Sequence, residues 1–259
     1  MDDVAPPVIA LQDVAKRFDS GLLAVDGVSL TIGEGEFVTL LGPSGCGKST
    51  LLKLMSGLAS PSSGLVVSPA QQDQTAGSTA FVFQEATLMP WTTVFDNVWL
   101  PLRLQGQSRH EARALIERVL RLVGLGDFQQ SYPSQLSGGM KMRVSIARAL
   151  VTKPKVLLMD EPFAALDDIT RQRLNHDLLN WWHGQKMVVV FVTHNVAEAV
   201  FLSQRVVVMG ARPGKIVTEL CIDQPYPRAA AFRETQSFLQ HCKTLNGALE
   251  AVSSTGGVR

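Results

Sequence analysis

Residues 42–50 combine residue types and a spacing that suit binding of a phosphate chain. The segment has three glycines, a lysine at position 48 and hydroxyl residues at 49 and 50. A loop around a polyanion presents backbone N–H groups, and glycine lets the backbone approach closely. Lys48 would give a positive charge to the β- and γ-phosphates, and Ser49 a hydroxyl ligand to Mg²⁺. The pattern predicts binding of a nucleoside triphosphate through Gly42, Pro43, Ser44, Gly45, Cys46, Gly47, Lys48, Ser49 and Thr50.

A pair of carboxylates downstream suits the same chemistry. Four apolar residues, 156–159, precede Asp160 and Glu161. Such a short run is typical of a buried strand, whose end would place both carboxylates at one edge of a sheet. Asp160 is the candidate ligand of Mg²⁺, and Glu161 is the candidate base for an attacking water. Lys48 is counted with Glu161 among the candidate catalytic residues.

A strand before the loop and a helix after it must position these residues. The run 37–41 is short and partly β-branched, and residues 51–55 suit the following helix. Helical patterns separate most later apolar runs, which predicts an α/β fold with a mainly parallel sheet. The first runs, joined by short turns, predict an antiparallel β layer beside it. The expected strands cover residues 8–11, 28–32, 37–41, 80–83, 156–159, 187–192 and 205–209.

Strand signals nearly vanish between residues 88 and 150, which predicts a helical insertion. Ser108 and Glu111 have the spacing of a capping box that starts one of its helices. Residues 60–80 and 253–259 are rich in small and polar residues, so loops are expected there. The expected division of a single domain, 1–259, is a core with its β layer over 1–87 and 151–222, a helical part over 88–150 and a helical extension over 223–259 that caps the sheet.

The composition is that of an ordinary globular chain without a strong charge imbalance. Its 259 residues include 24 basic and 23 acidic side chains, and 46% are hydrophobic. A net charge of +1 gives no excess of positive charge of the kind that binds nucleic acid, so nucleic acid is not expected as a partner. No apolar stretch approaches the ~18–20 residues that cross a bilayer, and the first residues are acidic. A cytoplasmic location is therefore expected.

The three cysteines lack metal-ligand spacing and suit free thiols in a reducing compartment. Cys46 lies in the phosphate loop, beside Lys48 and a predicted helix start, and such surroundings favour the thiolate. This position predicts that nucleotide protects Cys46 from alkylation. The alternative is that Cys46 is a small filler side chain without a redox role.

A further segment opens a predicted helix with a serine and two glycines. Residues 136–140 read Leu-Ser-Gly-Gly-Met. This pentapeptide resembles the signature motif of ABC ATPases, and further motifs follow that family's order. Gln84 resembles the Q-loop glutamine, residues 164–167 resemble the D-loop, and His194 resembles the switch histidine. Phe18 matches the aromatic residue that stacks on adenine.

The resemblance implies a P-loop NTPase core, RecA-like in architecture, with the helical insertion as a subdomain. It also implies a head-to-tail homodimer, because ATP is clamped between the phosphate loop of one copy and the signature motif of the other. Gln84 and His194 would then join Glu161 and Lys48 in catalysis, and Gln84 would join Ser49 and Asp160 around Mg²⁺. The implied ATP contacts beyond the phosphate loop are Phe18, Gln84, Ser137, Gly138, Gly139 and Asp167.

Residues 83–98 are similar to the segment that follows the Q-loop glutamine in the ATPases of nitrate, sulfonate and taurine importers. Residues 161–167 and 211–216 are similar to that group as well. The resemblance implies uptake of a small solute through separate transmembrane permease subunits, fed by an external solute-binding protein. The chain would then lie peripherally on the cytoplasmic face of the inner (plasma) membrane.

Two alternatives come from other classes. One is a soluble ABC ATPase of DNA repair or translation, and the other is a small-molecule kinase that shares only the phosphate loop. A kinase explains neither the signature segment nor His194. The insertion between Gln84 and Ser137 is short for the long coiled coil of the repair class.

Residues 88–104 contain more apolar side chains than a small helical insertion needs for its own core. Part of this surface is therefore expected to meet a partner protein, Trp91 above all. The alternative is that these side chains only join the insertion to the core. The residues concerned are Met89, Trp91, Phe95, Val98, Trp99 and Leu102.

Overall fold

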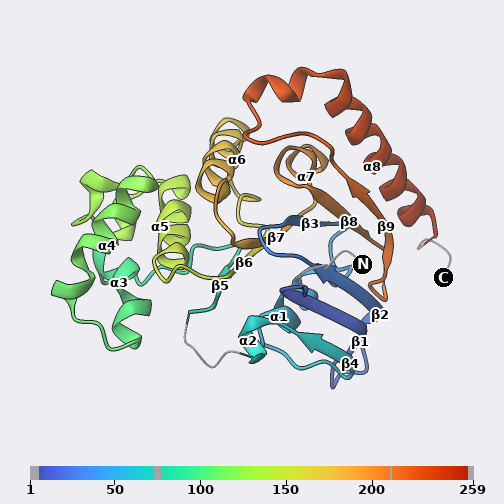
Figure 1. The fold of residues 1–259 in the computed structure, drawn as a ribbon, viewed down its shortest axis with the longest axis horizontal. Helices are drawn as coiled ribbons and strands as arrows, with labels where there is room; N and C mark the ends of the chain where they lie inside the picture. Colours follow the sequence, from blue (N-terminus) through green and yellow to red (C-terminus); the bar gives the residue numbers. More distant parts are fainter. Residues whose placement is uncertain (1–5, 73–76, 211, 256–259) are drawn as a thin grey trace.

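The computed structural model describes residues 6–72, 77–210 and 212–255. Its centre is a six-stranded sheet with the strand order β5-β6-β7-β3-β8-β9. Neighbouring strands run parallel except for β9, which pairs antiparallel with β8, so the predicted mainly parallel sheet is confirmed (Figure 1). The strands are β3 (Phe37–Leu41), β5 (Thr79–Val82), β6 (Val156–Asp160), β7 (Val188–Thr193), β8 (Arg205–Met209) and β9 (Ile216–Cys221).

A second, antiparallel sheet with the order β2-β1-β4 lies beside the first. Strands β1 (Ile9–Arg17) and β2 (Leu23–Ile32) confirm the predicted β layer. Helix α1 (Lys48–Met55) packs its buried Leu51 and Leu52 in the cluster that joins the two sheets. The phosphate loop and its helix are thus held between two layers of strands.

The expected loop over residues 60–80 is wrong in its first part. Strand β4 (Ser63–Val67) pairs antiparallel with β1, and a short helix, α2 (Pro69–Gln72), follows it. β4 lies at an edge of its sheet and fully buries only Val66, so its small and polar residues show no strand pattern. Residues 73–76 of the expected loop lie outside the described residues.

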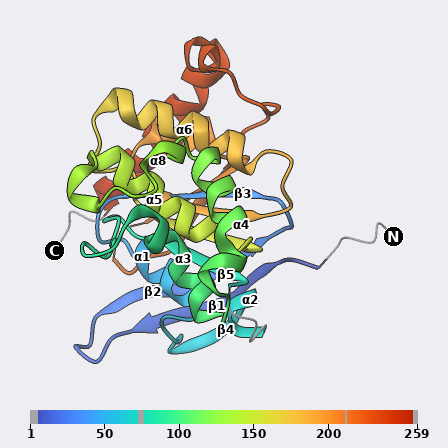
Figure 2. The same cartoon turned by 90° about the vertical axis from the view of Figure 1, so that its left-hand side faces the viewer.

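The predicted helical insertion consists of α3 (Val94–Leu104), α4 (Arg109–Leu122) and α5 (Gly138–Leu150). These helices stand together beyond the β5 edge of the central sheet (Figures 1 and 2). The capping box that starts α4 is confirmed. The Ser108 hydroxyl accepts a hydrogen bond from the Glu111 N–H, and the Glu111 carboxylate accepts one from the Ser108 N–H.

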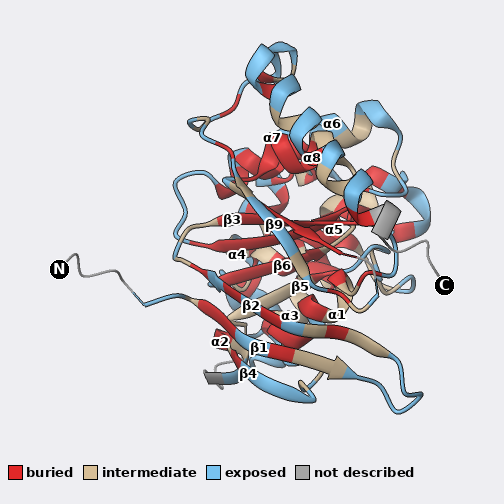
Figure 3. Ribbon diagram, turned by 90° about the vertical axis from the view of Figure 1, so that its right-hand side faces the viewer, coloured by how far each residue is buried: buried red, intermediate tan, exposed pale blue. Residues whose placement is uncertain are grey.

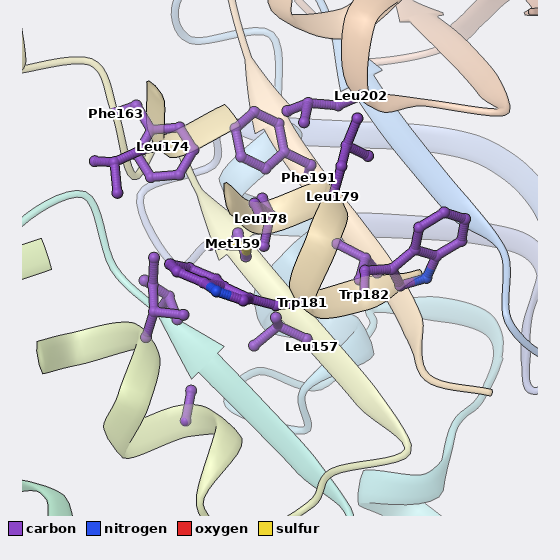
Figure 4. Close-up of a cluster of buried hydrophobic side chains, with 14 of the residues drawn as sticks. Leu157, Met159, Phe163, Leu174, Leu178, Leu179, Trp181, Trp182, Phe191 and Leu202 are labelled. Atoms are coloured by element: carbon purple, nitrogen blue, oxygen red, sulfur yellow. The ribbon is translucent and has the colours of Figure 1, made fainter. Parts of the chain in front are cut away.

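Helices α6 (Asp168–Trp182) and α7 (Val196–Leu202) cover the face of the central sheet opposite to α1. Alternate residues of each strand point to opposite faces. Met159 and Phe191 accordingly belong to the cluster with α6 and α7, in which Leu178 of α6 is also buried (Figure 4). The strands are buried along most of their length, and exposed residues gather on the outer faces of the helices and on β4 (Figure 3).

Helix α8 (Gln236–Thr255) follows a 3₁₀ turn and contacts α7, β8 and β9, where it buries Phe238 and Leu245. This placement agrees with the expected capping role. The helix extends into the range 253–259 that was expected to be a loop, and residues 256–259 lie outside the described part. None of the helices in the described ranges has the length and hydropathy of a membrane-spanning segment.

Arg228 fastens the segment before α8 to the end of α7. Its side chain is 1% exposed and stacks on Tyr226. The last carbonyl groups of a helix have no partner within the helix, so a buried cation can satisfy them. The acceptors are the backbone carbonyl oxygens of Val200, Phe201, Ser203, Ile222 and Gln224.

Replacing Arg228 by Met is expected to lower the free energy of unfolding by roughly 2–4 kcal/mol, because buried carbonyl groups lose a charged donor. Urea unfolding measures this change. Arg113→Met is a matched control, because the Arg113 side chain is 71% exposed and pairs with Glu117 on the same helix. The control is expected to lose less than about 0.5 kcal/mol. Equal stability of the two variants would contradict the role of Arg228.

Candidate functional site

The phosphate loop connects the end of β3 to the start of α1, as predicted. Gly45 and Gly47 have φ angles of 77° and 96°, left-handed values that favour glycine. A Cβ atom on Gly47 would lie 2.7 Å from the carbonyl oxygen of Ala24, and one on Gly42 would lie 2.8 Å from that of Met209. The folded loop itself therefore requires these glycines, in addition to the expected approach of a phosphate.

The Lys48 side chain lies inside this loop and is 3% exposed. Its ammonium donates hydrogen bonds to the carbonyl oxygens of Gly42 and Pro43, at 2.8 and 2.9 Å. It also lies 3.8 Å from Glu161 Oε1. The structure thus brings together the lysine and the carboxylate that the sequence places 113 positions apart.

Ser49 and Asp160 meet at the position predicted for Mg²⁺. Ser49 Oγ donates to Asp160 Oδ1 at 2.8 Å. Burial raises the pKa of the Asp160 carboxyl, and the hydrogen bond from Ser49 partly offsets this effect. A hydroxyl and a carboxylate are hard oxygen donors, and a bound cation would compensate for burial of the negative charge. The donor set therefore fits Mg²⁺.

Glu161 and His194 face each other from the ends of β6 and β7. His194 Nδ1 lies 3.0 Å from Glu161 Oε2. Glu161 has a φ of 45°, which is uncommon for a residue other than glycine, and its N–H donates to the carbonyl oxygen of Val192 at 3.1 Å. Strained backbone of this kind concentrates at functional sites. The carboxyl ends of β3, β6 and β7 share one edge of the sheet, where ligands of open α/β sheets bind.

The signature segment lies apart from this edge. Ser137 is the N-cap of α5, and its hydroxyl accepts a hydrogen bond from the Met140 N–H at 3.3 Å. Ser137 and Gly138 are exposed, whereas Gly139 is buried. Helix α5 belongs to the helical insertion, on the far side of β5 from β3 and the phosphate loop (Figure 1). Among the described residues, no hydrogen bond or ion pair joins residues 137–139 to the phosphate loop.

The family model of the ABC transporter matches residues 25–164, which include the phosphate loop, the signature segment and both carboxylates. The chain belongs to the ABC transporter family. It is 40% identical over 234 residues to an aliphatic sulfonates import ATP-binding protein of Bacillus cereus, covering 89% of this chain and 91% of that protein. It is 44% identical over 210 residues to the taurine import ATP-binding protein of Rhizobium johnstonii, covering 81% and 80% respectively.

A solved structure gives the same fold. The dimeric post-hydrolysis state of an ATP-binding cassette bound to ADP and Pi has a TM-score of 0.73 and 32% identity, and covers 84% of this chain and 100% of that chain. The predicted P-loop NTPase fold is confirmed, and as an ABC cassette the chain is an ATP hydrolase. Both of these relatives are named as import ATP-binding proteins, and these names do not support the alternative of DNA repair or translation.

Three further residues that were predicted to contact ATP lie at the surface of the cassette. Phe18 is 40% exposed, and Lys16 Nζ lies 5.6 Å from its ring centre. Gln84 follows β5 and is exposed. Asp167 is the N-cap of α6, and the hydrogen bond donated by the Thr170 N–H lowers the pKa of its carboxyl. These three residues are accessible to a nucleotide or to a second copy.

Sequence reasoning missed the role of Arg148 in the cassette. From the end of α5, its guanidinium donates to the carbonyl oxygens of Ala86 and Thr87 and to the Thr87 hydroxyl, at 2.9 to 3.0 Å. This arginine ties the signature helix to the segment that follows Gln84. The only sign of this role in the sequence was an arginine among the small and apolar residues of the predicted helix.

A buried network beside His194 was also missed. The Thr193 hydroxyl donates to Glu198 Oε2 at 2.6 Å, and Asn175 Nδ2 donates to Glu198 Oε1 at 3.4 Å. The Asn195 N–H donates to the Thr193 hydroxyl at 3.0 Å. Burial raises the pKa of the Glu198 carboxyl. The Glu198 carboxylate thus holds the Thr193 side chain, whose hydroxyl in turn accepts from the backbone N–H of Asn195. The available signal in the sequence was a glutamate inside the apolar run of α7.

The expected thiolate at Cys46 is wrong. Burial raises the pKa of this thiol, and this effect exceeds the opposing one of Lys48. The side chain is 1% exposed and packs between the two sheets. Cys46 therefore matches the alternative of a small filler side chain, and protection from alkylation by nucleotide loses its physical basis.

The expected partner surface over residues 88–104 is smaller than the sequence indicated. Phe95, Val98 and Leu102 are buried in the core of the insertion. Trp99 is half-buried, and its indole N–H donates to the carbonyl oxygen of Gln107. Trp91 is 74% exposed and Leu104 is 79% exposed, so these two large apolar side chains of the segment remain accessible to a partner.

Proposed function

We propose that two copies of this cassette close head to tail around ATP and drive a separate transmembrane permease. One observation carries this proposal, the separation of the two predicted halves of the nucleotide site. The phosphate loop lies at the carboxyl edge of the central sheet, whereas Ser137 and Gly138 are exposed at the start of α5. A helix start suits a phosphate, so the signature segment of one copy can complete the site of the other.

The surface around Asp167 supports a contact between copies. Ile169, two residues further along the chain in α6, is 83% exposed. A large apolar side chain at this exposure beside a predicted nucleotide-contact residue suits a surface that becomes covered. In the closed dimer, Asp167 and Ile169 of each copy would line the interface.

Each closed site would use its residues in distinct roles. Lys48 binds the β- and γ-phosphates, and Glu161 accepts a proton from the attacking water. His194 holds the Glu161 carboxylate from its other side and orients the γ-phosphate. Ser137, Gly138 and Gly139 of the second copy donate to the γ-phosphate.

Ser49, Asp160 and Gln84 would hold Mg²⁺. When bound, this ion neutralises charge that develops on the β- and γ-phosphate oxygens. Phe18 would stack on the adenine ring, for which its exposed ring is available. Through Arg148, a shift of the segment after Gln84 would be transmitted to the signature helix.

We further propose that the chain serves an importer of a small solute such as nitrate, a sulfonate or taurine. The names of its relatives support this role. Phe83 directly precedes Gln84 and is 39% exposed, and Trp91 lies seven residues after Gln84 and is 74% exposed. Both side chains offer apolar area for a permease helix. An external solute-binding protein would deliver the solute, and the chain would lie on the cytoplasmic face of the plasma membrane.

Replacing Trp91 by Ala is expected to reduce solute uptake by the assembled transporter about tenfold or more, because an exposed aromatic anchor of the interface is lost. ATPase activity of the isolated dimer is expected to stay within about twofold of the original, because Trp91 is 74% exposed and, among the described residues, shares no hydrogen bond or ring contact with one assigned to the nucleotide site. Uptake into vesicles and ATP turnover measure the two effects. Leu239→Ala is the control, since Leu239 is an exposed apolar side chain, at 60%, on α8 and outside residues 88–104, and it is expected to leave uptake unchanged. Loss of ATP binding, or unchanged uptake, would contradict the assignment of Trp91.

A further inference from the structure

A pocket of about 570 Å³ opens at the edge of the central sheet where the parallel strands begin. We call it the basal pocket. One wall comes from α4 and the end of α5, and the other comes from the end of α6 and the residues that precede β6 and β7. The pocket therefore lies on the seam between the helical insertion and the sheet with its covering helices.

The basal pocket is separate from the nucleotide site. Glu161 and His194 follow the last residues of β6 and β7, whereas Lys155 and Met187 of the pocket precede the first. These strands contain five and six residues. At ~3.3 Å per residue, the two edges are roughly 17–20 Å apart.

The floor of the basal pocket is apolar and held in place. Val119 and Leu122 of α4 line it together with Trp181 of α6 and Met187. The Trp181 indole N–H donates to the carbonyl oxygen of Leu122 at 3.1 Å, and the Trp182 indole N–H donates to that of Met187 at 2.9 Å. The indole N–H of Trp181 and the carbonyl groups of Leu122 and Met187 are thus satisfied, and the floor left for a ligand is hydrocarbon and aromatic.

Cationic side chains surround this floor. Arg118, Lys153, Lys155 and Lys186 line the pocket, and all four are exposed. Among the described residues that line it, Glu34 is the only carboxylate, and it pairs with Lys186 at 3.5 Å. Beside the paired Lys186, Arg118 and Lys153 give the rim an excess of positive charge, in a chain whose net charge is only +1.

We propose that the basal pocket binds a small anion with an apolar body, in the manner of an aromatic carboxylate. The hydrocarbon floor takes up the ring system, and the cationic rim pairs with the carboxylate. Such a ligand contacts both sides of the seam at once. It therefore stabilises the arrangement of helical insertion and sheet in which the pocket has this shape.

The test uses 2-naphthoate as the probe and two molecules that each lack one of its features. Saturation-transfer NMR titration of the full chain without nucleotide is expected to give a dissociation constant on the order of 0.1–1 mM for 2-naphthoate. The neutral 2-naphthamide is expected to bind about two- to fivefold more weakly, because it loses the ion pair. Acetate, which keeps the charge without the ring system, is expected to show no saturable binding. Equal affinity for 2-naphthoate and 2-naphthamide would overturn the proposal.

A pair of charge-reversal variants locates the binding. Lys153→Glu is expected to weaken 2-naphthoate binding about three- to tenfold, because it places a carboxylate on the rim. Lys243→Glu makes the same change in net charge on α8, outside the pocket, and is expected to leave the affinity unchanged. Both lysines are exposed, so both variants are expected to fold. Equal effects of the two variants would overturn the proposal. ATP turnover does not enter the measurement, so a failure of the proposed transport function would leave this result interpretable.

Discussion

The Glu161→Gln variant is expected to lose ATP turnover by about 100- to 1000-fold, because an amide cannot accept the proton of the attacking water. Glutamine keeps the size of the side chain and can still contact His194, which lies 3.0 Å from the carboxylate. Lys48 keeps its hydrogen bonds to the loop carbonyls. MgATP binding is therefore expected to persist, and a dimer with bound ATP is expected to accumulate.

Turnover assays and size-exclusion chromatography with MgATP measure these two effects. Glu117→Gln is a matched control, because that glutamate lies on α4, away from the nucleotide site, and pairs with Arg113. The control is expected to keep its turnover and to form no lasting dimer. Turnover of Glu161→Gln above roughly a tenth of the original would exclude Glu161 as the general base.

The Ser137→Arg variant is expected to lose turnover by about 100-fold or more, because a long cation at the start of α5 blocks closure of the composite site. The variant is expected to bind ATP as before when monomeric, since Ser137 is not bonded to the phosphate loop of its own chain. Turnover and equilibrium ATP binding separate the two effects.

Ser108→Arg provides a stringent control for that loss. Ser108 is the N-cap of α4 as Ser137 is of α5, so both variants lose a helix cap worth about 1 kcal/mol. The Ser108→Arg variant is expected to retain turnover, because α4 is not assigned to the dimer interface. Equal losses in both variants would mean that weakened capping, rather than a blocked interface, explains the effect.

Much of the fold was predictable because the central strands carry their own signal. β3 and β8 have the predicted bounds, since both are buried and apolar along most of their length. β4 and β9 were missed, because edge strands need little apolar surface and obtain their hydrogen bonds from a neighbour. β9 shows this plainly, since its middle residues, 217–219, are exposed.

The site residues were named from motif spacing, whereas their mutual contacts required the structure. Motif spacing named Lys48, Glu161 and His194 one by one. It did not show that the Glu161 carboxylate lies between the Lys48 ammonium and the His194 imidazole. The supporting residues Arg148 and Glu198 were missed because their partners lie far away in sequence or are backbone atoms. At Cys46 the sequence instead predicted a feature that the structure does not support. The sequence neighbours of Cys46 suggested a reactive thiolate, whereas packing between the sheets buries the thiol and raises its pKa.

Mixing two inactive variants tests most directly whether the site is shared between copies. Lys48→Ala removes the phosphate-loop half of a site, and Ser137→Arg removes the signature half. If each site joins halves from two chains, a mixed dimer carries both defects in one site and leaves the other intact. Mixing the two proteins is expected to restore up to roughly a quarter of the original turnover, because about half of the dimers are mixed and each has one working site.

A second mixture serves as the control for this measurement. Lys48 and Glu161 lie 3.8 Å apart in one chain and so belong to the same half. Mixing Lys48→Ala with Glu161→Gln is therefore expected to restore nothing, because every site keeps one defective half. Recovery in the first mixture alone is the result that the shared site predicts. No recovery when Lys48→Ala is mixed with Ser137→Arg would contradict it.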